Sequence, residues 1–263
     1  MAAPSPDSAA SPERGRVFEI RGFRFRLWPL LLAAAAMQAC LVPARELARW
    51  IFRGGGPAWA PHVGLFVFLA IVLQALSGLA AIGVMRWLLP RADSHLRWPP
   101  ERSRVGLALA LGVAMGLIML AADYWPDLVR GRAPEASYSL EPSIAGGWLL
   151  AMITTGLAEE TIFRGFLVGM LAALLPGRVR VGRFEISMAG VLVALLFGLA
   201  HYESFLVDPL SQAIAQQLYA FAWGLVYVWL MERSRSLLAP IVAHGVGNFV
   251  EVASVMLLTA ASR

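Results

Sequence analysis

The sequence predicts an all-α fold of the polytopic membrane class, a transmembrane helical bundle of about seven helices. Of its 263 residues, 59% are hydrophobic and only 15% are charged, whereas soluble domains carry about 25% charged residues. The apolar residues are grouped in long blocks, and a helix needs about 20 such residues to cross a hydrocarbon layer of about 30 Å. We therefore expect lipid to surround most of the chain.

Seven apolar runs follow one another along the chain, and six to eight membrane helices fit the same pattern. They are residues 28–44, 62–89, 104–122, 144–175, 187–207, 211–231 and 237–260. The fourth run is too long for one straight crossing, so we expect it to tilt, to break near Gly156, or to continue as an interfacial helix after Arg164. No soluble domain fits between the runs. Residues 28–263 therefore form one transmembrane domain.

Residues 1–27 are rich in Pro, Ser and Ala and then in Arg, which predicts a disordered basic cytoplasmic tail. A cleaved signal peptide fits less well, because the charged stretch is long and no small-residue cleavage site follows it. Segments 86–104, 176–186 and 232–236 are also basic, whereas 123–143 and 202–210 are acidic on balance. By the positive-inside rule the N-terminus is cytoplasmic and the C-terminus is outside. One segment does not follow this rule, because it should lie outside and yet contains Arg45, Arg49 and Arg53. This favours an interfacial stretch there or a first run that does not span the membrane.

Composition also narrows the possible partners. The net charge of +5 does not indicate nucleic acid, because the arginines lie in short segments between apolar runs. All 22 basic residues are arginine, which is typical of a GC-rich genome and points to a bacterial source, hence the inner membrane. Cys40 is the single cysteine, so no disulfide framework or cysteine metal site is expected.

Ionisable residues inside apolar runs carry the functional signal, because each costs about 2.5–3.5 kcal/mol to insert. The fourth run contains Glu159, Glu160 and Arg164. Glu160 and Arg164 are four residues apart and can form an ion pair on one helix face. Glu159 is rotated by about 100° and faces elsewhere. A carboxylate in a largely apolar, water-accessible pocket can act as a general base on water.

Two further runs bring polar groups to similar depths. The fifth has Phe197 and His201 on one helix face, and the seventh has His244 and Asn248 on one face. Counting about 1.5 Å per residue places Glu159, His201 and Asn248 near the middle of the membrane. One pocket, which we expect to open toward the cytoplasm, could therefore hold all of these groups.

This set of groups suits peptide hydrolysis, which needs a base for water and donors for the developing negative charge. No serine or cysteine has a histidine placed to activate it, which argues against an acyl-enzyme. Glu159, His201 and His244 would also form a zinc ligand set with an open fourth position. The residues alone leave the metal-free and zinc-dependent mechanisms both open.

At these residues the sequence resembles the CAAX-protease and bacteriocin-processing (Abi) family of intramembrane glutamic endopeptidases, also called the CPBP family. The family pattern is Glu-Glu-x-x-x-Arg, Phe-x-x-x-His and His-x-x-x-Asn on successive membrane helices. The match covers about residues 144–255, and its order and spacing agree with the family. Three such motifs in order are specific, although each alone is weak.

The resemblance implies a protease that requires no cofactor, although zinc remains an alternative. Glu159 with His201 would activate water, His244 and Asn248 would stabilise the oxyanion, and Glu160 and Arg164 would organise the site. The implied substrate is a membrane-associated protein or peptide cut near its C-terminus. The eukaryotic branch of the family removes a tripeptide after a prenylated cysteine, and a bacterial member is expected to have another substrate.

Other functions and residues fit less well. A non-catalytic immunity or scaffold protein would need none of these polar groups, a transporter would more readily show two related halves, and a di-iron bundle would need paired Glu-x-x-His motifs. Glu251 extends the His244–Asn248 stripe and is interpreted as structural. Trp223, Tyr227 and Trp229 are interpreted as residues of the membrane-interface belt.

Overall fold

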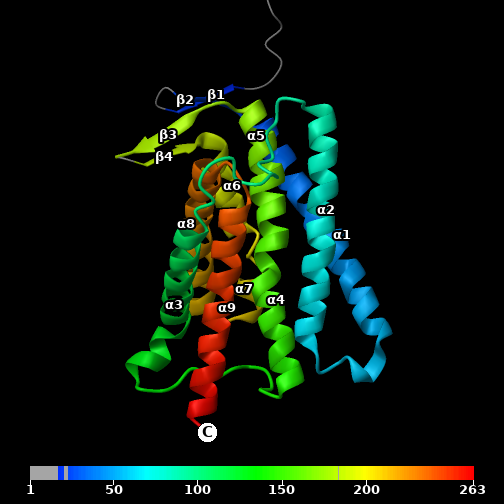
Figure 1. Cartoon of the computed structure of the whole chain (residues 1–263), viewed down its shortest axis with the longest axis vertical. Helices are drawn as coiled ribbons and strands as arrows, with labels where there is room; N and C mark the ends of the chain where they lie inside the picture. The colour runs from blue at the N-terminus through cyan, green and yellow to red at the C-terminus, as the bar shows by residue number, and fades with distance from the viewer. Residues whose placement is uncertain (1–16, 21–22, 183) are drawn as a thin grey trace, which may run out of the picture.

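The computed structural model describes residues 17–20, 23–182 and 184–263, and it shows a bundle of long helices (Figure 1). The helices are α1 Trp28–Gly54, α2 Val63–Leu88, α3 Val105–Val129, α4 Pro142–Glu160, α5 Gly169–Leu174, α6 Met188–Leu199, α7 Ser204–Val207, α8 Leu210–Ser234 and α9 Leu238–Ala261, with a 3-10 turn η1 Gly56–Ala58 and a π-helix η2 Thr161–Val168. Five of the predicted apolar runs correspond to one helix each, the fourth run corresponds to α4, η2 and α5, and the fifth corresponds to α6 and α7. The predicted all-α membrane bundle is confirmed.

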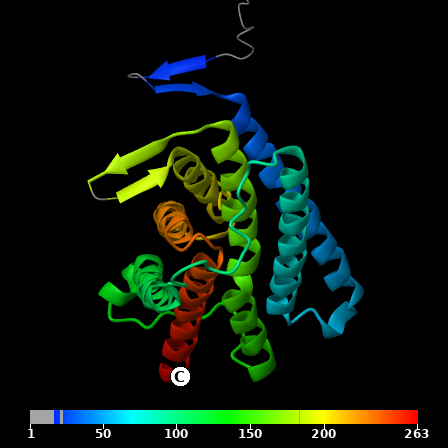
Figure 2. The ribbon, with the colours of Figure 1, turned by 45° about the horizontal axis from the view of Figure 1, so that its top comes forward.

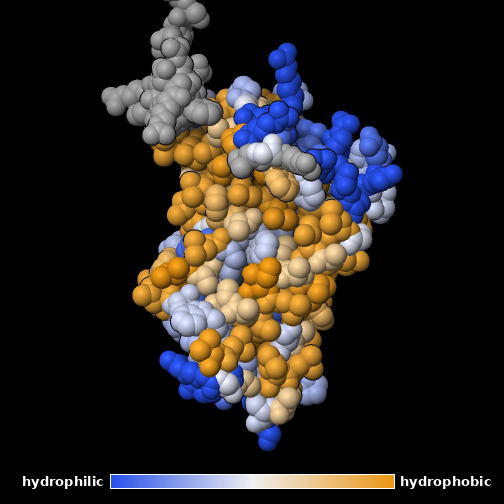
Figure 3. Space-filling view, turned by 90° about the vertical axis from the view of Figure 1, so that its left-hand side faces the viewer, coloured by the Kyte–Doolittle hydropathy of each residue, from blue (hydrophilic) through white to orange (hydrophobic). Residues whose placement is uncertain are grey.

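Six of the described segments are long and apolar enough to cross a membrane: α1, α2, α3, the Met188–Val207 segment, α8 and α9. The fourth run, which carries the two adjacent glutamates, is not among them. Figure 3 shows the expected surface on one face, with hydrophobic side chains covering the middle and hydrophilic ones gathered toward the two ends. The chain is therefore a multi-pass membrane protein.

The fourth run is one continuous helical segment, in which α4 passes into η2 directly after Glu160 and then into α5. The expected break near Gly156 is wrong, because Gly156 lies inside α4. The expected interfacial helix after Arg164 is also wrong, because every residue of η2 is buried. A π-helix adds a residue to the turn, and such segments occur often at functional sites.

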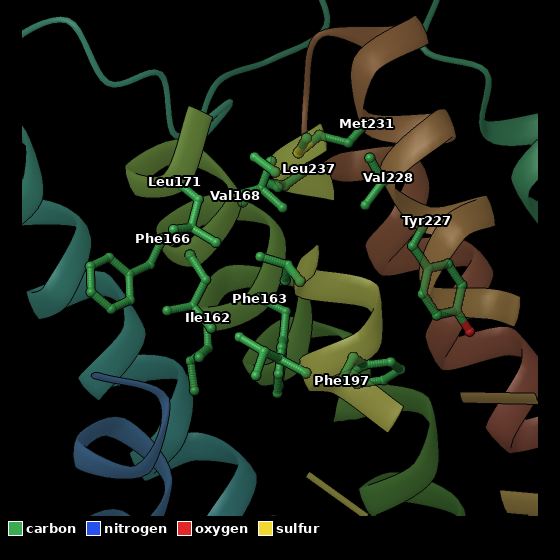
Figure 4. Close-up of a cluster of buried hydrophobic side chains, with 14 of the residues drawn as sticks. Ile162, Phe163, Phe166, Val168, Leu171, Phe197, Tyr227, Val228, Met231 and Leu237 are labelled. Carbon is green, nitrogen blue, oxygen red and sulfur yellow. The ribbon is translucent and has the colours of Figure 1, made fainter. Parts of the chain in front are cut away.

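The side chains of η2 contribute to the hydrophobic core of the bundle. Figure 4 shows the labelled members of this cluster: Ile162, Phe163, Phe166, Val168, Leu171, Phe197, Tyr227, Val228, Met231 and Leu237. They come from η2, α5, α6, α8 and the start of α9, so the cluster ties the fourth run to the rest of the bundle. Each fully buried large apolar side chain contributes about 1.5–3 kcal/mol.

Helix α9 packs closely on α3 and α4 through small residues. A Cβ atom added to Gly156 of α4 would lie 2.5 Å from the Ile241 carbonyl oxygen of α9, and one added to Gly245 would lie 2.2 Å from the Ile153 oxygen. Gly112 and Gly116 make the same kind of close approach between α3 and α9. Small residues let helix backbones approach in membranes. The positions of α9 and α4 relative to each other are therefore tightly constrained.

Two strand pairs lie at one end of the bundle, opposite the C-terminus (Figures 1 and 2). Strand β1 (Val17–Ile20) pairs with β2 (Phe23–Arg26), and β3 (Arg178–Val181) pairs with β4 (Phe184–Ser187), both antiparallel. The first pair occupies part of the predicted 1–27 tail, of which residues 1–16, 21 and 22 lie outside the described residues.

Several arginines also gather at this end, which we call the basic end. The loop after α2 and the turn before α9 meet there, where Arg97 Nε donates to the Arg235 carbonyl oxygen at 3.0 Å. Arg178 of β3 pairs with Glu232 of α8 at 2.8 Å. The basic segments that the sequence places on one side of the membrane thus share one end of the bundle.

Helix α1 extends to Gly54, so Arg45, Arg49 and Arg53 lie on its last turns and not in a loop.

Helix α6 is short. It has 12 residues against 25 in α8, which makes it about 18 Å long against about 37 Å. Residues 200–209, which we call the strap, complete this crossing and include the short α7. Arg45 Nη1 holds the strap to α1 through Glu203 Oε2 at 2.7 Å.

Candidate active site

Two of the three motifs meet at the carboxylate of Glu160, which is fully buried. Its Oε1 accepts from Arg164 Nη1 at 3.1 Å, so the predicted ion pair is present in the structure. The same oxygen accepts from His244 Nδ1 at 2.7 Å. The second of these contacts links α4 to α9 and could not be anticipated from spacing within one helix.

Arg164 is also fully buried and is surrounded by aromatic rings. Its guanidinium lies 4.4 Å from the ring centre of Phe197 and 5.0 Å from that of Tyr227. Its Nη2 donates to the Gly224 carbonyl oxygen of α8 at 3.1 Å. A buried cation needs a paired charge and hydrogen bonds to offset its desolvation. The contacts with the two aromatic rings stabilise the guanidinium further. Arg164 thereby joins η2, α6 and α8.

Glu159 faces a different direction from Glu160, as its place on the helix predicts. Its Oε2 lies 3.6 Å from His244 Nε2, and its side chain retains 22% of its exposure. Within the described residues that oxygen is buried and makes no hydrogen bond, whereas the side chain as a whole reaches both cavities. Because the Nδ1–H of His244 is donated to Glu160, the ring orientation is fixed and Nε2 faces Glu159.

His201 is placed differently from the expected water-activating partner of Glu159. Its Nδ1 donates to the Phe197 carbonyl oxygen at 2.8 Å, one turn earlier in α6, which leaves Nε2 free to accept. For the described side chains, no nitrogen of His201 lies within 4.0 Å of a Glu159 oxygen. The histidine closest to Glu159 is His244.

Two cavities meet at Glu159 and His201. The larger cavity, about 340 Å³, is lined mainly by polar groups of α1, α2 and the strap, including Gln38, Arg45 and Glu203. None of its lining residues belongs to the loops of the basic end. The strap forms one wall of this cavity. The opening toward the cytoplasm stays a prediction.

The smaller cavity, about 170 Å³, is lined mainly by residues of α8 and α9. The complete lining is Met119, Met152, Glu159, Phe197, His201, Gln216, Tyr219, Ala220, Trp223, Tyr227, His244, Asn248 and Glu251. Asn248 therefore faces the same space as Glu159 and both histidines. Glu251, interpreted from sequence as structural, also lines this cavity. Five of the seven motif residues line these two cavities, and the other two, Glu160 and Arg164, form the buried ion pair beside them.

The location of Tyr227 differs from the one that the sequence predicted. Its place in the membrane-interface belt is wrong, because it is 2% exposed and its ring stacks on His244 at 4.7 Å with an angle of 11°. Trp223 likewise lines the smaller cavity. Ala220, Gly224, Tyr227 and Met231 follow one another at intervals of three or four residues. This spacing marks the buried face of α8 and could have located Tyr227.

Among the described residues, no three His, Cys, Asp or Glu side chains are grouped so that they could hold a metal ion. The set considered for zinc consists of Glu159, His201 and His244. One nitrogen of each histidine is already engaged, by Phe197 and by Glu160 respectively. The carboxylate and the two remaining histidine nitrogens instead face a shared cavity.

Comparison with known families gives one match. Residues 141–250 match the family model described as type II CAAX prenyl endopeptidase Rce1-like. No curated protein and no solved structure matches the chain. The matched segment is less than half of the chain, but it contains α4, η2, α6 and α8 and all three polar motifs. Residues 141–250 are therefore similar to the Rce1-like family of CAAX prenyl endopeptidases.

Proposed function

We propose that the protein is an intramembrane endopeptidase that uses Glu159 to activate water without a metal. The observation that carries this proposal is the pair of adjacent glutamates with separate surroundings. Glu160 is fully buried and bonded to Arg164 and His244, whereas Glu159 faces both cavities. A carboxylate that accepts no protein hydrogen bond beside a fixed imidazole suits general-base catalysis.

In this mechanism Glu159 takes a proton from a water molecule while the water oxygen bonds to the carbonyl carbon of the substrate. The carbonyl electron pair moves to its oxygen, giving a tetrahedral oxyanion. Asn248 donates a hydrogen bond to that oxygen through its amide, and His244 donates a second one from Nε2 when both of its ring nitrogens carry a proton. The intermediate then reforms the carbonyl and breaks the C–N bond, and the proton held by Glu159 passes to the leaving nitrogen. His201 orients the water through its free Nε2.

The proposed substrate is a membrane-associated protein or peptide cut near its C-terminus. Support comes from the family match and from the position of the cavities beside the strap, at membrane depth. We further propose that the basic end is cytoplasmic, which would place the N-terminus there, in a bacterial inner membrane. The bilayer and the substrate would be the partners, with no nucleic acid.

Replacement of Glu159 tests the proposal. Membranes containing the wild type, Glu159→Gln, His201→Ala or the control Glu135→Gln would be compared by mass spectrometry of new protein C-termini. Glu135 is an exposed carboxylate in the loop before α4, so its loss should change nothing. We expect cut sites that are present in the wild type and the control and absent in the other two. Identical cut sites in all four samples would refute the protease function.

Metal dependence is tested separately. A metal-free mechanism predicts that purified enzyme keeps its activity after incubation with a strong chelator. Loss of activity with the chelator, followed by recovery with zinc, would instead support the Glu159, His201 and His244 zinc set.

A further inference from the structure

The Tyr227 side chain has a feature that packing does not explain. Its ring stacks on His244 and lies under the Arg164 guanidinium, and a phenylalanine ring would make both contacts equally well. The hydroxyl group is therefore not needed for either contact. In Figure 4 this hydroxyl points away from the labelled hydrophobic side chains.

The hydroxyl of Tyr227 also has no hydrogen-bond partner within the described part of the chain, although the residue is only 2% exposed. The hydroxyl oxygen is not among the fully buried side-chain atoms that lack a partner, so it is accessible from a cavity, where water or a ligand can form a hydrogen bond with it. Tyr227 lines the smaller cavity together with Glu159, His201, His244 and Asn248. A partner of the Tyr227 hydroxyl would therefore occupy the space in which the proposed reaction takes place.

The position of Tyr227 is also fixed in advance of any binding. Arg164 Nη2 holds the Gly224 carbonyl oxygen, about one turn before Tyr227 on α8, at 3.1 Å. The ring contacts this guanidinium and stacks on the His244 imidazole, whose Nδ1 is bonded to Glu160. A donor that needs no rearrangement is the kind that stabilises a developing charge most strongly.

We propose that the Tyr227 hydroxyl donates a hydrogen bond to the carbonyl oxygen of the scissile peptide as that oxygen becomes negative. Tyr227 would be a catalytic residue contributed by α8, a helix that carries none of the three polar motifs. No proton is transferred in this step, because the phenol only donates a hydrogen bond to the oxyanion. The inference rests on the proposed function and adds a donor beside Asn248.

The test compares Tyr227→Phe, which keeps the stacked ring, with Tyr227→Leu, which removes it. Tyr138→Phe is the matched control, because Tyr138 also loses only a hydroxyl and stacks on Trp148 in another part of the chain. The probe is a synthetic peptide spanning a cut site that wild-type membranes produce and Glu159→Gln membranes do not. Initial rates and thermal unfolding would be measured in detergent for each full-length variant.

We expect Tyr227→Phe to lower kcat by about 10²–10³-fold, with KM and the unfolding temperature close to those of wild type. Tyr138→Phe should keep the wild-type rate. A wild-type kcat for Tyr227→Phe, or a fall in kcat matched by the same fall in unfolding temperature as in Tyr227→Leu, would overturn the role of the hydroxyl. If Glu159→Gln changes no cut site at all, the proposed protease function fails first, and this inference fails with it.

Discussion

Replacing Gly245 by Ala tests whether the contact between α4 and α9 sets the geometry of the site. The added Cβ would lie 2.2 Å from the Ile153 carbonyl oxygen, whereas an ordinary contact needs at least 3.4 Å. The helices must therefore separate by 3.4 − 2.2 = 1.2 Å at this point. His244 is the neighbouring residue on α9, and its 2.7 Å bond to Glu160 would lengthen to about 3.9 Å if the whole shift reached it. That exceeds hydrogen-bond distance.

A misplacement of about 1 Å costs roughly 10²-fold in rate, so we expect Gly245→Ala to lower kcat by about that factor. The measurement is the initial rate on the identified peptide, together with thermal unfolding in detergent. Gly146→Ala is the matched control, because Gly146 lies on α4 with nothing within 4 Å of an added Cβ. A Gly245→Ala enzyme with wild-type kcat would refute the idea that this approach positions His244.

Three further changes should alter stability in defined ways. Arg164→Met leaves the Glu160 carboxylate buried without its cation, so the free energy of unfolding in detergent should fall by about 3–5 kcal/mol; an unchanged unfolding temperature would contradict this. Burial lowers the pKa of His95 from its ordinary value near 6.5, so the neutral form is favoured in the fold and the unfolding temperature should decline as pH falls below about 6.5. His95→Asn, which suits the φ of 51° at this position, should flatten that decline, and equal slopes would exclude His95 as the cause. Thr259→Val removes the buried hydroxyl that donates to the Pro134 carbonyl oxygen at 3.1 Å, so amide hydrogen exchange in the loop before α4 should accelerate while the helices stay protected.

Much of the architecture was predictable because a bilayer imposes simple constraints. Apolar length alone located every membrane segment, and four-residue spacing predicted the Glu160–Arg164 pair. The contact of Glu160 with His244 was not predictable, since it depends on how α9 is placed against α4. The π-helix after Glu160 was missed because hydrophobic spacing does not distinguish a wide helical turn from an ordinary one.

Tyr227 shows a second limit of sequence reasoning. A tyrosine near the end of an apolar run has the same appearance whether it lies at the headgroups or in the core. Its packing partners, Arg164 and His244, come from two other helices. The strap was also treated as the end of an ordinary crossing, because its residues continue an apolar run that includes Phe205, Leu206 and Val207.

The short α6 has a consequence for the lipid around the protein. Non-helical backbone at membrane depth is tolerated only where protein or water covers it, and the strap carries Glu203 and Asp208. Acyl chains beside the strap would meet these carboxylates, and we expect the bilayer to be thinner on this flank than along α8. Hydrolysis consumes one water molecule for each bond cut. In the proposed reaction, water that enters through such a thinner region would have only part of the hydrocarbon layer to cross before it reaches Glu159.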